Sequence, residues 1–252
     1  MLKSDVDVIG IIAKNKANTC KNQPYKFVLR GIMAGFYLVV AIILSYTSGA
    51  LMNNISIELG KITSAMTFSI ALALICFLGG ELFTGNNLVM GIGAYSKKTS
   101  YKDLLRVFVF TYIGNLIGNI AISYLFVKSG SNTSLLLEYM HPIIDGKLSL
   151  SPSEMLIKGI LCNFIVCISV MASIKMKEEG AKMTVMFWCI FAFVIAGFEH
   201  SIANMGIFSI GYFLMGELPI YDVINSMFWV TIGNILGGTV LYALPLYKMA
   251  ID

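Results

Sequence analysis

Long apolar runs without charged residues dominate this sequence of 252 residues. A helix needs about 20 apolar residues to cross the hydrocarbon core of a bilayer, and six runs approach or exceed that length. They span 31–51, 62–96, 107–127, 159–174, 183–216 and 223–247. Charged residues make up 13% of the chain, about half the share of a soluble domain. The sequence therefore predicts an integral membrane protein and excludes a soluble enzyme or a disordered chain.

Two of the six runs, 62–96 and 183–216, are too long for one straight crossing. At 1.5 Å per residue, an unbroken helix of about 35 residues overshoots the hydrocarbon core by roughly 20 Å. Each run contains one charged residue near its middle, Glu81 in the first and Glu199 in the second. Small and polar residues around both glutamates tolerate tight backbone and satisfy amides that lipid leaves unpaired. We predict that both crossings are broken helices.

Positive charge is unevenly divided between the loops on the two sides of the membrane. The chain has 18 lysines and arginines, and the loops on one side contain only Lys61, Lys128, Lys147 and Lys158. Because Lys and Arg favour cytoplasmic loops, we predict a multi-pass protein of the inner (cytoplasmic) cell membrane with both termini in the cytoplasm. This distribution leaves no basic patch for a nucleic acid.

Residues 1–26 precede the first apolar run. Within them, Val8, Ile9 and Ile12 alternate with Lys14 and Lys16 at helical spacing, which indicates an amphipathic helix on the cytoplasmic membrane surface. A frayed, solvated tail explains the same residues equally well. Residues 27–252 are predicted to form the six-helix membrane domain.

Three sequence landmarks recur in the same order in two halves, about 27–127 and 155–248. The pairs are Arg30-Gly31-Ile32 with Lys158-Gly159-Ile160, the segments around Glu81 and Glu199, and Gly114-Asn115 to Gly118 with Gly233-Asn234 to Gly237. Because each half has three crossings, the second half enters the membrane from the opposite side. We therefore predict an all-α membrane fold, an inverted 3+3 repeat with two broken helices. Such proteins place their pathway where the broken helices meet.

Both breaks contain polar side chains that are costly to place inside a membrane. An ionised group at the bilayer centre costs about 2.5 to 3.5 kcal/mol. The repeated placement of Glu81 and Glu199 favours a structural role, in which the carboxylates accept backbone N–H bonds; an ion-ligand or proton-carrier role is the alternative. His200 has no counterpart, because Leu82 stands at the equivalent position. An imidazole can hydrogen-bond a weak acid's anion or exchange a proton with it, so we predict that His200 lines the pathway.

Residues that bind metals or cofactors are scarce. One histidine within the apolar runs excludes bis-histidine haem and multi-histidine metal sites, and the five cysteines form no C-x-x-C pair. His200 and Ser201 are neighbours, so on a helix they diverge by about 100° and form no hydrolytic pair. The other histidine, His141, is expected to be solvated in an outer loop over 128–158. We predict no cofactor, no metal and no catalytic residue.

Three motifs stand out in this chain, at 80–86, 158–167 and 197–205. Together they resemble the formate/nitrite transporter family, and the resemblance extends over roughly 27–248. It implies an aquaporin-like protomer, five of which form a ring with a separate pore in each, and permeation of formate, nitrite or hydrosulfide. Formate-type members usually follow the Asn-Met pair with an aromatic residue and a proline. Here Gly206-Ile207-Phe208 follows, which is more similar to the hydrosulfide-channel branch.

The resemblance also implies roles for individual residues. His200 matches the central pore histidine, and Thr84 matches a threonine that hydrogen-bonds the histidine region. Lys147, which by itself is interpreted as a solvated loop residue, matches a lysine that draws anions in, and Asn163 matches a polar partner. Apolar rings that narrow the pore correspond to Phe68, Leu72, Leu82, Val166 and Phe193. The structural polar residues at the breaks are Glu81, Asn86, Glu199 and Asn204.

The sequence thus predicts a homopentameric channel for small monovalent weak-acid anions, embedded in membrane lipid and without enzymatic activity. A proton-coupled secondary transporter of formate or nitrite is the alternative, because it would use the same residues. A membrane enzyme lacks a catalytic pair. A structural or receptor subunit leaves the two broken crossings unexplained.

Overall fold

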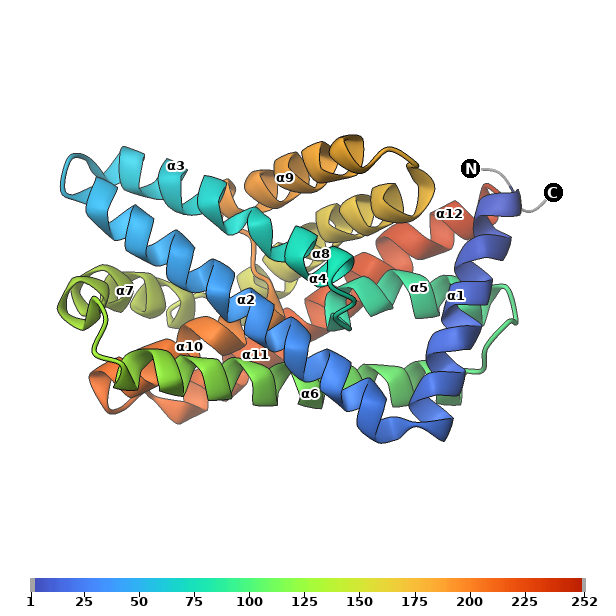
Figure 1. Cartoon of the computed structure of the whole chain (residues 1–252), viewed down its shortest axis with the longest axis horizontal. Coiled ribbons are helices and arrows are strands. Elements are labelled where there is room, and N and C mark those ends of the chain that lie inside the picture. The colour runs from blue at the N-terminus through green and yellow to red at the C-terminus, as the bar shows by residue number, and fades with distance from the viewer. Residues whose placement is uncertain (1–2, 251–252) are drawn as a thin grey trace.

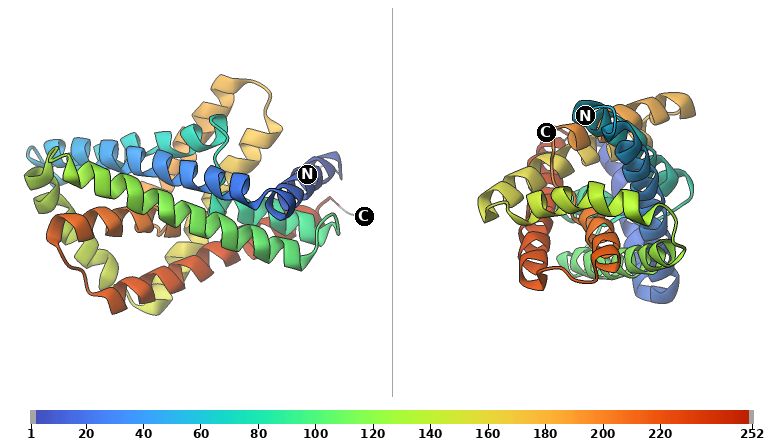
Figure 2. Two further views of the ribbon diagram at one scale, coloured as in Figure 1. Left: turned by 60° about the horizontal axis from the view of Figure 1, so that its bottom comes forward. Right: turned by 90° about the vertical axis from the view of Figure 1, so that its left-hand side faces the viewer.

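The computed structural model describes residues 3–250 as a bundle of helices (Figure 1). In chain order these are α1 (Lys3–Asn22), α2 (Pro24–Asn53), α3 (Ile57–Phe68), α4 (Ile70–Phe77), α5 (Phe83–Tyr95), α6 (Tyr101–Lys128), α7 (Thr133–Leu148), α8 (Pro152–Lys175), α9 (Glu179–Ile195), α10 (Ser201–Met215), α11 (Ile220–Ile235), the π-helix η1 (Leu236–Ala243) and α12 (Leu244–Lys248). No strand occurs within 3–250. Helices α1 and α12 lie at one end of the molecule and α7 at the other (Figures 1 and 2).

The all-helical membrane fold is confirmed. Within residues 3–250, five helical segments are long and apolar enough to cross a membrane: Pro24–Asn53, Ile57–Phe77, Tyr101–Lys128, Pro152–Lys175 and Ile220–Lys248. Both overlong runs are interrupted as expected. The first helix break separates α4 from α5 at 78–82, and the second separates α9 from α10 at 196–200.

The amino-terminal segment is helical, so the frayed-tail interpretation is wrong. Helix α1 buries Val6, Ile9, Ala13, Ala17 and Cys20 against α5, α6 and α2. These positions recur every three or four residues, which places them on one face of the helix. The apolar face of α1 therefore packs on the protein itself.

The segment expected as an outer loop contains a helix instead. In α7, the side chains of Leu136, Met140 and Ile144 are buried, and their spacing of four residues is that of a helical face. Pro142 lies inside this helix, and it is the residue that made a loop the natural expectation. His141 is on the exposed face, 3.0 Å from Asp145.

Glycines let the long helices cross closely in each half of the chain. A methyl group added to Gly31 of α2 would lie 3.1 Å from the Cα of Gly114 in α6, and one added to Gly159 of α8 would lie 3.2 Å from the Cα of Gly233 in α11. Backbone contact at both crossings requires the missing side chains. The same two glycine motifs that define the sequence repeat therefore define the two helix crossings.

Candidate functional site

The first break is fastened to its neighbours through the backbone and one asparagine. The N–H of Glu81 donates to the carbonyl of Arg30 at 3.0 Å, and the N–H of Phe83 donates to Asn115 Oδ1 at 3.0 Å. The Nδ2 of Asn115 donates to the carbonyls of Gly31 and Glu81, both at 2.8 Å. One side chain in α6 thus satisfies two backbone groups that the broken helix leaves open and ties them to the carbonyl of Gly31 in α2.

The second break has the same set of bonds. The N–H of Glu199 donates to the carbonyl of Lys158 at 3.3 Å, and the N–H of Ser201 donates to Asn234 Oδ1 at 2.8 Å. The Nδ2 of Asn234 donates to the carbonyls of Gly159 at 2.8 Å and Glu199 at 3.0 Å. The two breaks are therefore built to one plan.

One part of the structural expectation for the glutamates is wrong. Their carboxylates were expected to accept backbone N–H groups, whereas Asn115 and Asn234 accept them. The asparagines were visible in the sequence as parts of the repeated Gly-Asn motif. A short amide that both donates and accepts can serve N–H and C=O groups together, which a carboxylate cannot.

Each carboxylate is instead held in a buried ion pair. In the first break, Glu81 is 5% exposed and accepts from Asn86 Nδ2 at 3.1 Å and from the Nζ of Lys16 in α1. The sequence alone does not identify Lys16 as a partner of Glu81, because it places this residue among the cytoplasmic positive charges and on the polar side of the amino-terminal helix.

The second break repeats this arrangement with a lysine from α7. Glu199 is 4% exposed and accepts from Asn204 Nδ2 at 2.7 Å. The Nζ of Lys147 lies 2.9 Å from both carboxylate oxygens of Glu199 and 3.0 Å from Asn204 Oδ1. Lys147 is thus no solvated loop residue, and its charge is compensated by the buried glutamate.

Helical spacing explains why the two lysines reach the breaks. Lys16 follows Ala13 by three residues and precedes Ala17 on the buried face of α1. Lys147 follows Ile144 by three residues on the buried face of α7. Each lysine therefore points with the apolar side chains of its helix toward the protein.

His200 directly precedes α10 and is 5% exposed. Its Nδ1 accepts from the N–H of Ala203 at 3.0 Å, and its Nε2 lies 2.9 Å from Thr84 Oγ1. An Nδ1 that accepts a hydrogen bond carries no proton, so the neutral imidazole holds its proton on Nε2 and donates it to Thr84. The ring of Phe193 stacks on the imidazole, with 5.9 Å between ring centres and 20° between planes.

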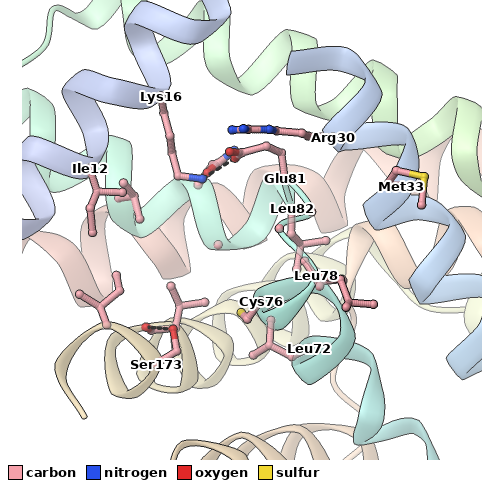
Figure 3. A pocket seen from close by; sticks show the side chains of 18 of the residues that line it. Ile12, Lys16, Arg30, Met33, Leu72, Cys76, Leu78, Glu81, Leu82 and Ser173 are labelled. Atoms are coloured by element: carbon pink, nitrogen blue, oxygen red, sulfur yellow. Dashed lines mark hydrogen bonds and ion pairs between the residues drawn. The ribbon is translucent and has the colours of Figure 1, made fainter. Parts of the chain in front are cut away.

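Three cavities lie in series through the protein. The α1-side cavity has a volume of about 610 Å³ and includes Lys16, Arg30 and Glu81 in its lining; Figure 3 shows these residues together. The α7-side cavity has a volume of about 440 Å³ and is lined in part by Lys147 and Glu199. A central cavity of about 10 Å³ shares lining residues with both.

The central cavity collects the apolar positions that the resemblance singled out. Its lining consists of Leu38, Phe68, Ala71, Leu72, Ile75, Leu82, Val166, Ile190, Phe193 and His200. All five expected constriction residues are among them, although they come from five different helices or breaks. Leu72 and Leu82 also border the α1-side cavity, whereas Phe68, Phe193 and His200 also border the α7-side cavity.

Two of the expected pathway residues lie behind this lining. Thr84 is fully buried and touches the pathway through its bond to His200. The Nδ2 of Asn163 donates to Asn87 Oδ1 at 2.8 Å and to the carbonyl of Asn234 in α11 at 2.6 Å. Asn163 thus ties α8 to α5 and to α11, and it does not line these three cavities.

Within the described residues 3–250, no group of three or more His, Cys, Asp and Glu side chains is placed to hold a metal ion. Glu81 forms an ion pair with Lys16 at the first break, and Glu199 forms one with Lys147 at the second. An all-helical membrane bundle with two broken crossings, and with cavities that approach a narrow centre from both ends, is the architecture of a membrane channel or transporter.

Comparisons with known proteins identify the family. The sequence model of the formate/nitrite transporter family matches residues 6–248. The nitrite transporter NirC of Salmonella typhimurium is 31% identical over 248 residues, covering 94% of this chain and 89% of that protein. A probable formate transporter of Methanothermobacter thermautotrophicus is 31% identical over 236 residues, covering 86% of each. The chain belongs to the formate/nitrite transporter family.

Solved structures agree with this assignment. A structure described as an FNT family ion channel superposes with a TM-score of 0.91 at 28% identity, covering 98% of this chain and 99% of that chain. A pentameric formate channel with formate bound shares the fold, with a TM-score of 0.78 at 24% identity over 91% of this chain. The named relatives are transporters and channels, so the protein is a membrane transport protein and not an enzyme.

Proposed function

We propose that the protein is a passive channel for small monovalent weak-acid anions, which pass through each protomer beside His200. The observation that carries this proposal is the series of three adjoining cavities, with His200 as the one polar side chain among the residues that line the central one. The family supplies the chemical class, because its named members transport nitrite or formate.

The size of the central cavity determines how an anion crosses. A volume of about 10 Å³ is roughly that of a single probe sphere, the minimum for one water molecule. An anion must therefore shed its hydration shell, and a bare charge among apolar side chains is costly. Passage as the neutral acid avoids most of this cost, which favours weak acids such as nitrous acid, formic acid and hydrogen sulfide.

His200 supplies the polar contact at the edge of this dry segment. Its Nε2–H is directed at Thr84 Oγ1, so an anion that arrives from the α7 side competes with the threonine for the same proton. The donated hydrogen bond stabilises the anion until it takes up a proton. The Asn163 amide supports this region from behind by fixing Asn87 beside Thr84 on α5.

The arrangement of the whole protein is proposed on the same basis. The α1 side faces the cytoplasm, with both termini there, in a protein of the inner (cytoplasmic) membrane. The two halves, 27–127 and 155–248, form an inverted 3+3 repeat, which the matching bonds at the two breaks support. The chain assembles as a homopentamer in membrane lipid, as the formate channel of the same fold is described.

Hydrosulfide belongs to the proposed substrate range together with nitrite and formate. The support is the sequence after Met205, where glycine and isoleucine replace the aromatic residue and proline usual in formate-type members. The relatives named as nitrite transporters support the inclusion of nitrite.

A proton-coupled secondary transporter is the second candidate, because a histidine beside a dry segment also suits obligatory proton exchange. Purified protein in liposomes separates the two. A channel gives stopped-flow uptake of nitrite, formate and hydrosulfide that proceeds with equal pH on both sides. Uptake that stops without an imposed proton gradient would establish the carrier, and no uptake above empty liposomes would refute both.

A further inference from the structure

The cations that line the α1-side and α7-side cavities differ in whether a carboxylate compensates their charge. Lys16 and Lys147 each bond a buried glutamate. Such a pair has almost no net charge at a distance, and within the protein the two charges satisfy each other. Neither lysine is therefore a strong source of positive potential for an anion that approaches from solution.

Two other cations occupy equivalent positions in the two cavities. Arg30 lines the α1-side cavity, and Lys158 lines the α7-side cavity. Among residues 3–250, neither side chain lies within ion-pair distance of a carboxylate. Figure 3 shows Arg30 beside Glu81, whose ion pair is made by Lys16.

The backbone fixes both cations at the breaks. The carbonyl of Arg30 accepts the N–H of Glu81, and the carbonyl of Lys158 accepts the N–H of Glu199. Each cation also immediately precedes the glycine at a helix crossing, Gly31 or Gly159. The fold therefore holds Arg30 and Lys158 at defined places in the two cavities, and within residues 3–250 neither side chain makes an ion pair.

We infer that Arg30 and Lys158 are the anion-collecting residues of the α1-side and α7-side cavities. This inference rests on the proposed function as an anion channel. A fixed positive charge in a cavity with low-dielectric walls raises the local anion concentration and the rate of capture. Lys61, which also lines the α7-side cavity, adds to the potential on that side only.

The inference predicts an effect that depends on the side of the membrane. Right-side-out and inside-out membrane vesicles present the two cavities separately to external nitrite. Lys158→Gln should raise the apparent KM for uptake from the α7 side about two- to fivefold at low salt, and it should leave the maximal rate and the KM from the α1 side unchanged. Arg30→Gln should give the mirror-image result.

Control variants separate the electrostatic attraction of the anion from effects on folding and from the loss of a positive charge elsewhere in the protein. Arg30→Lys and Lys158→Arg keep the charge and should keep the wild-type KM. Lys102→Gln and Lys128→Gln each remove one positive charge from outside the two cavities and should have no effect on KM. Because added salt screens the interaction, 0.5 M sulfate as an impermeant salt should bring the neutral variants and wild type together.

Two failures are distinguishable. Wild-type uptake with the same KM in both glutamine variants, or a KM change that persists unaltered at high salt, would overturn the inference and leave the proposed function intact. Absence of nitrite uptake by wild-type vesicles would overturn the proposed function and the inference with it.

Discussion

The two helix breaks have the same skeleton and different chemistry. The shared parts are Glu81, Asn86 and Asn115 in the first break and Glu199, Asn204 and Asn234 in the second. At the residue after the glutamate, however, the first break has Leu82 and the second has His200. Both line the central cavity. The comparison shows that the scaffold of the breaks is duplicated, whereas a polar side chain that lines the central cavity is present once.

The lysines that complete the two breaks also differ in origin. Lys16 comes from α1, which packs on the membrane helices and is tied to them at its other end by a bond from Lys175 to Asp5 at 2.9 Å. Lys147 comes from α7, between two membrane crossings. The first break therefore depends on contacts with α1, and the second on contacts with α7.

The largest expected effect tests whether the two skeletons are equivalent. Asn115→Leu and Asn234→Leu each remove three hydrogen bonds and leave buried backbone groups unpaired, so each should lower the free energy of unfolding by roughly 3 kcal/mol or more. Thermal unfolding of the purified variants measures this. Asn119→Ala, which loses one bond to the carbonyl of Asn115, should cost about 1 kcal/mol. If only one of the leucine variants is destabilised, the breaks are not equivalent.

The next effect should distinguish the breaks through their ion pairs. Glu199→Gln leaves Lys147 charged and without its carboxylate, with 16% of its side chain exposed. Losing one partner of a buried pair costs about 3 to 5 kcal/mol when burial is complete, so about 2 kcal/mol is expected here. Glu81→Gln should cost less, because the side chain of Lys16 is more exposed to water, at 21%.

The double variants complete this test. Lys147→Gln with Glu199→Gln, and Lys16→Gln with Glu81→Gln, remove both charges and should recover most of the lost stability. Equal losses for the two glutamate variants, with no recovery in the doubles, would show that the carboxylates act independently of these lysines.

The sequence alone predicted the features that depend on local composition. The length of the runs without charged residues predicted the membrane crossings. The single glutamate within each overlong run predicted the two helix breaks. The apolar spacing in 5–16 indicated α1. In each case the physical cause, lipid exposure or helical periodicity, acts on neighbouring residues and is therefore visible in a short window.

Features that depend on long-range contacts were not predicted. Lys16 and Glu81 are 65 residues apart, and nothing near Lys16 distinguishes it from the other cytoplasmic lysines. Helix α7 was not predicted either, because 128–158 contains Pro142 and was expected to be an outer loop. At the breaks, asparagines and not glutamates accept the backbone N–H groups. The sequence did not predict this, because it depends on which helix lies beside each break.

A third prediction compares the two borders of the central cavity. Leu82→Ala widens its α1-side border and Phe193→Ala its α7-side border, so uptake of a larger weak acid such as acetic acid should rise about threefold in both variants, in line with the steric control of pores. Liposome uptake of acetate relative to formate measures it. Ile224→Ala, at an exposed position on α11, should leave the ratio unchanged; an unchanged ratio in both cavity variants would place the constriction elsewhere.

The smallest expected effect concerns the packing of α1 on the membrane helices. Burial raises the pKa of the Cys20 thiol to about 11, so little thiolate is present at pH 7 and maleimide labelling should be slow, rising about tenfold per pH unit below that pKa. Lys16→Ala removes the bond to Glu81 and should speed labelling, because it leaves a buried carboxylate unpaired and so weakens the packing of α1. Peptide mass spectrometry measures the rate, with Lys21→Ala as a control on the same helix. Equal rates in both variants would show that the ion pair does not hold α1.

The pH dependence of nitrite uptake in the His200→Asn variant tests the central claim most directly. Liposomes with equal pH inside and outside, scanned from pH 5 to pH 8, compare this variant with wild type while Leu82→Met controls for a change at the equivalent position. If the imidazole is the polar contact in the dry segment, the variant should conduct more slowly and lose the wild-type pH profile. Uptake that matches wild type at every pH would contradict the claim that anions cross beside His200.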